Sequence, residues 1–144
     1  MSSARDSGGS LTPFMGAINL LGNADAVSRA RKYVQRVCAG ISRNRLHEVV
    51  LLTTELATNS VRHSDSGRVP NGRLRIIVTG GVHAIRVQVI DEGSADSAPE
   101  VHPFSFSEPY RSRRLGLWIV QEIASSWGWH QHPKGRVVWF EVDL

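Results

Sequence analysis

The chain has a single cysteine, Cys38, so it cannot form an internal disulfide, and this is typical of a reducing compartment. No apolar run approaches the roughly 18 residues that a membrane-spanning helix needs. The first ten residues contain no apolar segment of the kind that a secretory signal requires. These absences predict a cytoplasmic protein without a membrane segment, in which Cys38 packs at the end of a helix.

Basic residues outnumber acidic ones, 17 to 13, which gives a formal net charge of +4 and a pI of about 10.0. This excess permits an anionic partner, which could be a nucleotide, a nucleic acid or an acidic protein. The basic residues are scattered except for a cluster at residues 111–114, and no basic stripe is interleaved with aromatic residues. The distribution of basic residues therefore disfavours a nucleic acid as the partner. DNA binding is supported by the pI alone and ranks behind the two hypotheses reached below.

The length of 144 residues and the 41% hydrophobic content fit one globular domain, and the sequence contains no internal repeat. Residues 1–13 are rich in serine and glycine at their start and are predicted to be a disordered tail. Residues 14–144 are predicted to form the single domain.

Local patterns predict the elements of this domain. Asn23 and Ser42 are suitable N-caps for two helices, which end near Gly40 and His63. The Gly-Gly pair at residues 80–81 separates two apolar runs and indicates an antiparallel hairpin. The order of elements predicts an α+β fold, a two-layer α/β sandwich with a mixed, mostly antiparallel sheet and helices packed on one face. The other predicted elements are strands at 14–21, 74–79, 84–91, 127–132 and 137–142 and a helix at 115–126.

The second predicted helix carries Glu55 and Asn59 four residues apart, so they lie on one helical face. A carboxylate can accept a proton, and a carboxamide oxygen is a ligand that Mg²⁺ accepts beside phosphates and water. The alternative is that both side chains only bond to neighbouring backbone. This pair predicts a nucleotide site that needs support from elsewhere in the chain.

Two further motifs are weak when each is taken alone. Asp91 and Gly93 close the apolar strand 84–91, where a carboxylate can accept a hydrogen bond from an adenine amine and a glycine lets a ring approach. Gly116 begins a helix after the long irregular segment 92–114, and free N–H groups at a helix start suit phosphate. An Asp-containing turn and a solvated basic loop are the alternatives.

These motifs occur in an order that resembles the histidine-kinase-like ATPase domains of the GHKL (Bergerat) superfamily. Within it, the chain is most similar to the stand-alone anti-sigma-factor serine/threonine kinases of Gram-positive bacteria. Residues 55–63 (ELATNSVRH) resemble the N-box, residues 91–93 (DEG) the G1 box, and residues 115–120 (LGLWIV) the G2 box. The resemblance covers residues 14–144, and the joint order of the boxes is more specific than any one of them.

The resemblance implies a Bergerat fold that binds ATP and Mg²⁺, with Glu55 as the general base and Asn59 as the Mg²⁺ ligand. Asp91 would hold the adenine amine, and the segment 92–114 would be a lid. The implied partners are an anti-anti-sigma (STAS-type) protein, a sigma factor and, as an assembly, a homodimer. The remaining nucleotide-binding positions implied by the boxes are Arg62, His63, Gly93, Arg114, Leu115, Gly116 and Leu117.

The chain also departs from the family pattern. Arg114 stands where relatives commonly have the first glycine of the G2 box, Ser94 where a second glycine is common in the G1 box, and Val137 where the last strand often has threonine. Two hypotheses follow. The first is a serine/threonine kinase that acts as an anti-sigma factor, and the second is a non-catalytic nucleotide-binding module that sequesters its partner.

Overall fold

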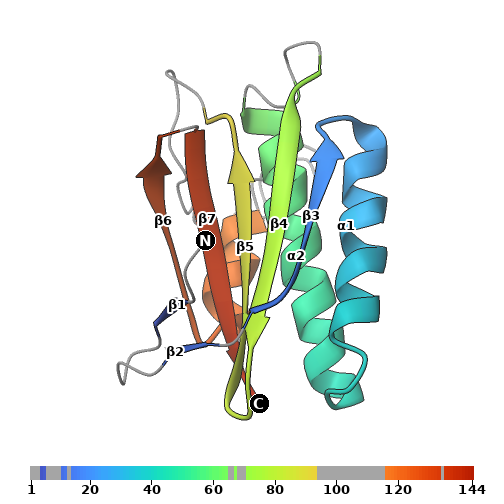
Figure 1. The fold of residues 1–144 in the computed structure, drawn as a ribbon, viewed down its shortest axis with the longest axis vertical. Coiled ribbons are helices and arrows are strands. Elements are labelled where there is room, and N and C mark those ends of the chain that lie inside the picture. Colours follow the sequence, from blue (N-terminus) through green and yellow to red (C-terminus); the bar gives the residue numbers. More distant parts are fainter. Residues whose placement is uncertain are drawn as a thin grey trace, which may run out of the picture.

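The computed structural model describes residues 4–5, 11–12, 14–64, 67, 71–93, 116–133 and 135–144. Within these residues, five strands form one open antiparallel sheet and three helices cover one of its faces (Figure 1). The predicted two-layer α+β sandwich is therefore confirmed. The pairings of this sheet are all antiparallel, whereas the sequence predicted a mixed sheet that was mostly antiparallel.

The first two helices begin at the predicted caps. Helix α1 spans Ala24–Val37, and the Asn23 side chain accepts a hydrogen bond from the backbone N–H of Asp25 at 3.0 Å. Helix α2 spans Arg43–His63, and the Ser42 hydroxyl accepts from the backbone N–H of Arg45 at 3.4 Å. Such caps satisfy N–H groups that have no partner inside the helix.

The sheet has the strand order β3-β4-β5-β7-β6, so β7 lies between β5 and β6. Strands β3 and β6 are the two edges of this sheet. Figure 1 shows the strands side by side, with α2 and α3 behind them and α1 beside β3. The bounds are β3 Phe14–Leu21, β4 Arg73–Gly80, β5 Ala84–Asp91, β6 Ser126–His132 and β7 Gly135–Asp143.

Helix α3 spans Gly116–Ile123, which is shorter than the helix predicted over residues 115–126. The chain leaves the helix because the backbone N–H of Ser125 donates to the carbonyl of Glu141 in β7 at 2.8 Å. Strand β6 then begins at Ser126. Pairing with β7 therefore ends the helix at a point that no local helix-stop residue marks.

The core lies between the sheet and the helices. The inward-facing residues of β5 (Ile85, Val87 and Val89) are at most 1% exposed, and Phe140 of β7 beside them is fully buried. Cys38 is buried just after the end of α1, as predicted, and burial raises the pKa of its thiol to about 11. Thiolate is the reactive form of cysteine, so this site does not favour catalysis by Cys38.

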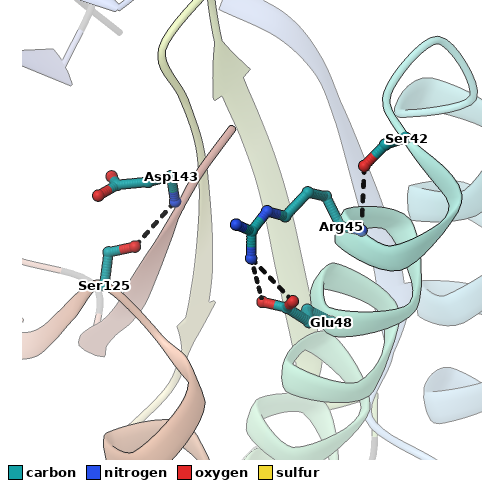
Figure 2. A network of polar contacts seen from close by, with 5 residues as sticks. All are labelled: Ser42, Arg45, Glu48, Ser125 and Asp143. Atoms are coloured by element: carbon teal, nitrogen blue, oxygen red, sulfur yellow. Dashed lines mark hydrogen bonds and ion pairs between the residues drawn. The ribbon is translucent and has the colours of Figure 1, made fainter.

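Two separate sets of polar contacts lie at the end of the domain where α2 begins and β7 ends, one within α2 and one between Ser125 and Asp143 (Figure 2). An Arg45 guanidinium nitrogen lies 2.9 Å from a Glu48 carboxylate oxygen on the next turn of α2, and both side chains are partly exposed. The backbone N–H of Asp143 donates to the Ser125 hydroxyl at 2.8 Å. An exposed ion pair of this kind contributes about 0–1 kcal/mol, so the contacts orient this end more than they stabilise it.

The N-terminal residues contain two short described strands. Strand β1 (Ala4–Arg5) pairs antiparallel with β2 (Leu11–Thr12). The rest of the segment 1–13 lies outside the described residues, so the disordered tail stays a prediction. None of the described helices has the length and apolar character needed to cross a membrane.

Candidate functional site

Glu55 and Asn59 lie one turn apart on α2, and both are partly buried. The start of α3 packs against them. A Cβ built on Gly116 would lie 3.1 Å from the Asn59 Oδ1 and 3.2 Å from the Glu55 Oε2. The backbone of α3 therefore approaches both side chains closely, and the absence of a side chain at Gly116 leaves them room.

The environment of Glu55 favours a proton acceptor. Burial raises the pKa of its carboxyl above the ordinary value, and the positive charge of Arg62 lowers it in part. A base with a raised pKa is better matched to accepting a proton near neutral pH than an exposed carboxylate is. Arg62 itself is exposed near the end of the same helix.

Asp91 ends strand β5 and is only 5% exposed. Its Oδ2 accepts a hydrogen bond from the Ser60 hydroxyl at 2.6 Å, and its Oδ1 accepts from the backbone N–H of Gly93 at 2.7 Å. Each carboxylate oxygen still has a lone pair for another donor. These two bonds hold the carboxylate in one orientation, in which it can receive an N–H group of a ligand.

Burial also raises the pKa of the Asp91 carboxyl. The hydrogen bonds from Ser60 and Gly93 and the charge of Arg136 act in the opposite direction and favour the ionised form. Glu92 raises the pKa slightly further because it is a like charge. The pKa of the Asp91 carboxyl is therefore raised on balance, because desolvation outweighs the three groups that favour its ionised form.

Two glycines shape the backbone around Asp91. Gly93 has φ +67°, a left-handed conformation that favours glycine. Gly135, at the start of β7, has φ +148°, and a Cβ there would run into the Asp91 carbonyl and lie 2.8 Å from the Glu92 Cα. The ends of β5 and β7 therefore approach each other more closely than any side chain at residue 135 would permit.

The structure thus places the predicted residues in two groups along α2. Glu55, Asn59 and Gly116 meet at one point, and Asp91 and Gly93 meet α2 through Ser60, one residue after Asn59. Leu117 is 7% exposed and belongs to the hydrophobic core. The predicted positions Arg114 and Leu115, and the side chain of His63, lie outside the described residues.

Sequence reasoning missed three residues of this site. Ser60 lies within residues 55–63 but is not among the predicted nucleotide-binding positions, and its hydroxyl on the buried side of α2 was the available signal. Gly135 and Arg136 lie between the predicted strands 127–132 and 137–142, and neither belongs to a motif, although Arg136 acts on Asp91. Each acts across elements that are distant in sequence, so no local pattern identified it.

The residues fit a divalent cation bound with a nucleotide. The described residues contain no group of three or more His, Cys, Asp or Glu side chains that could hold a metal alone. Mg²⁺ in nucleotide sites commonly uses one or two protein oxygens and takes its other ligands from phosphates and water. The Asn59 Oδ1, beside the open backbone of Gly116, suits that role.

Comparison with known proteins agrees with this arrangement. A family model described as a histidine kinase-like ATPase domain matches residues 21–142, which is most of the chain. The chain therefore belongs to this family, and membership implies ATP binding and ATP-utilising activity of the kinase type. No curated protein matches the chain.

Replacing Gly116 with alanine should separate folding from nucleotide binding. The added methyl group needs Asn59 and Glu55 to move by only a few tenths of an ångström, so we expect thermal stability to be nearly unchanged. The new Cβ would displace the Asn59 and Glu55 side chains, and we expect ATP affinity to fall about tenfold, or 1.4 kcal/mol. Calorimetry and thermal unfolding measure the two effects.

The matched control for this change is Gly40→Ala. A Cβ at Gly40 would meet nothing within 4 Å, so neither ATP affinity nor the fold should suffer. Wild-type ATP affinity in the Gly116 variant would show that the two side chains can move without consequence.

Proposed function

We propose that the chain is an ATP- and Mg²⁺-dependent protein serine/threonine kinase that phosphorylates an anti-anti-sigma (STAS-type) partner and acts as an anti-sigma factor. The observation that carries this proposal is the contact of the Gly116 backbone with both Glu55 and Asn59. It brings a proton acceptor and a cation ligand to the start of a helix, where phosphate groups are favoured. The resemblance of residues 55–63, 91–93 and 115–120 to these kinases supports the finer assignment.

In the proposed reaction, the hydroxyl oxygen of a partner serine or threonine attacks the γ-phosphorus of ATP. A new oxygen–phosphorus bond forms, the bond from the γ-phosphorus to the β,γ-bridging oxygen breaks, and ADP leaves. Glu55 takes the proton of the hydroxyl. Mg²⁺, held through the Asn59 Oδ1, would neutralise phosphate charge when bound, as phosphoryl transfer generally requires.

Recognition of the base is assigned to the Asp91 group. Asp91 would accept a hydrogen bond from the exocyclic amine of adenine, because Ser60 and Gly93 already fix its orientation. A guanine ring presents a carbonyl at that position and would face the carboxylate unfavourably. The proposal therefore includes a preference for ATP over GTP.

The alternative function is a non-catalytic module that binds nucleotide or sequesters a partner without phosphorylating it. Val137 favours it, because this residue is only 2% exposed and has no hydroxyl where relatives often have threonine. Capture of the partner would then survive the loss of Glu55. Cytoplasmic location, a sigma factor as a second partner and a homodimer belong to the same proposal as the kinase.

Calorimetry with ATP, with and without Mg²⁺, tests the premise that both functions share. In the wild type we expect Mg²⁺ to raise ATP affinity by about tenfold, since it screens phosphate charge near buried groups. Asn59→Ala should remove most of that gain and leave the Mg²⁺-free affinity within about threefold. Full Mg²⁺ dependence in the variant would remove Asn59 from the proposed site.

Labelling experiments then separate the two functions. Wild-type protein with radiolabelled ATP and a panel of anti-anti-sigma proteins should transfer phosphate to a serine or threonine. Binding of ATP without transfer to any protein of a broad panel would favour the non-catalytic module.

A further inference from the structure

The free edge of strand β3 lacks the features that usually discourage strand pairing. Among the described residues, β3 pairs only with β4, so its other edge presents backbone N–H and C=O groups. The strand is eight residues long and contains no charged residue and no proline. The register of its pairing with β4 shifts only at the start, between Phe14 and Gly16. Its end residues are exposed, Phe14 by 60% and Leu21 by 46%.

Positive charge borders this edge on the helical side. Helix α1 lies beside β3 (Figure 1), and Tyr33 of α1 packs against Gly16 of β3. The Arg36 guanidinium lies 5.4 Å from the centroid of the Tyr33 ring. Arg29 and Lys32 precede Arg36 by seven and four residues, so the three cations share one exposed face of the helix.

Positive charge borders the edge on the outer side of the sheet as well. An Arg75 nitrogen on β4 donates to the Asn19 Oδ1 on β3 at 3.1 Å. Burial raises the pKa of the Tyr33 hydroxyl, and both Arg36 and Arg75 lower it. The Arg36 and Arg75 guanidinium charges therefore both act on the Tyr33 hydroxyl beside β3, one from each face of the sheet.

We propose that the β3 edge binds an extended acidic segment of a partner protein, which adds to the sheet as a further strand. Main-chain hydrogen bonds would supply the pairing, and the flanking cations would select an acidic segment. The proposal stands whether or not the chain is a kinase, because it uses no residue of the nucleotide site.

Charge argues against a second copy of the chain as the occupant. Antiparallel pairing of two β3 edges would place both α1 helices on the same side of one continuous sheet. The rows of Arg29, Lys32 and Arg36 would then face each other, and such like-charge contacts disfavour association. The opposite edge of the sheet differs, since α3 and β6 contain no lysine or arginine.

A titration followed by nitrogen-15 NMR tests the proposal. The probe is a synthetic peptide of the length of β3 in which glutamate and valine alternate. We expect the amide signals of Phe14–Leu21 to shift, and binding to weaken at high salt. A peptide with lysine in place of glutamate should cause no such shifts, and neither should an acidic peptide with methylated backbone nitrogens.

Two charge variants of the protein complete the test. Arg29→Glu/Lys32→Glu should lower affinity for the acidic peptide about tenfold, whereas Arg31→Glu/Arg43→Glu, with the same charge change away from the edge, should alter it less than about twofold. Equal losses in the two variants would overturn the proposal. So would binding of the methylated peptide, an absence of shifts in β3, or β3 shifts that depend on protein concentration without peptide, which would assign the edge to a second copy.

Discussion

Replacing Asp91 with asparagine should reduce ATP affinity by about 100-fold, or roughly 2–3 kcal/mol. The carboxylate receives donors on both oxygens, from Ser60 and from Gly93. Asparagine has one acceptor oxygen, so its NH₂ group must face Ser60, the Gly93 N–H or the adenine amine. The Gly93 N–H and the adenine amine can only donate, and a buried donor facing a donor is costly. Ser60 could accept from the NH₂ group only by turning its hydroxyl, and the bonds to a charged carboxylate would still be replaced by weaker neutral ones. Calorimetry with ATP measures the loss.

The same variant should change how stability depends on pH. Burial raises the pKa of Asp91 in the folded protein above its value in the unfolded chain. The protonated carboxyl is therefore favoured by folding, and this contribution to stability is complete below the unfolded pKa and is lost as pH rises through the folded pKa. The free energy of unfolding of the wild type should therefore fall relative to Asp91→Asn as pH rises above the ordinary aspartate pKa of about 4. Urea unfolding at a series of pH values measures this difference.

The control for both measurements is Asp143→Asn, at the far end of β7, where the carboxylate is exposed. It removes one negative charge without touching Ser60 or Gly93, so ATP affinity should be unchanged. An Asp91 variant that binds ATP as tightly as this control does would place adenine recognition elsewhere.

Replacing Glu55 with glutamine should lower the rate of phosphate transfer by about 10²- to 10⁴-fold, the usual contribution of a positioned general base. Glutamine keeps the shape of the side chain beside Gly116 but cannot take up the proton of the attacking hydroxyl. ATP affinity should change less than about threefold, because the assigned role of Glu55 is in the reaction and not in holding nucleotide. Single-turnover labelling of the phosphorylated partner measures the rate.

Glu48→Gln is the matched control for this change. Glu48 lies seven residues before Glu55 on the same side of α2, and its carboxylate pairs with Arg45 outside the site. Its loss should leave the transfer rate unchanged. If Glu55→Gln transferred phosphate as fast as Glu48→Gln, Glu55 would not be the base. If Glu55→Gln still captured the partner but transferred no phosphate, the protein would also act by sequestration.

The elements that the sequence predicted well are those specified by neighbouring residues. The Asn23 and Ser42 caps determine where α1 and α2 begin, because a side-chain oxygen reaches a backbone N–H within three residues. The Gly-Gly pair at residues 80–81 indicates the antiparallel hairpin of β4 and β5 in the same local way. The end of α3 was predicted three residues too late, since it depends on a bond to Glu141 in β7.

In the candidate site too, the sequence predicted what neighbouring residues specify and not what depends on distant ones. Glu55 and Asn59 could be placed on one face from their spacing alone, and Asp91 and Gly93 could be placed at a strand end. Their relation to each other could not be worked out from spacing. Ser60 and Asp91 are 31 residues apart and meet only because α2 packs across β5.

By itself the sequence determined the helices, the strands, the α+β class and the short motifs that resemble a nucleotide site, because each depends on contacts within a few residues. Only the tertiary structure decided that Gly116 of α3 lies on Glu55 and Asn59, and that Gly135 of β7 lies against Asp91. It also decided that β3 has an edge with no partner among the described residues, and that this edge lies between two sets of cations. Sheet order, register and helix packing are properties of the whole folded chain, and they bring together residues that no local pattern connects.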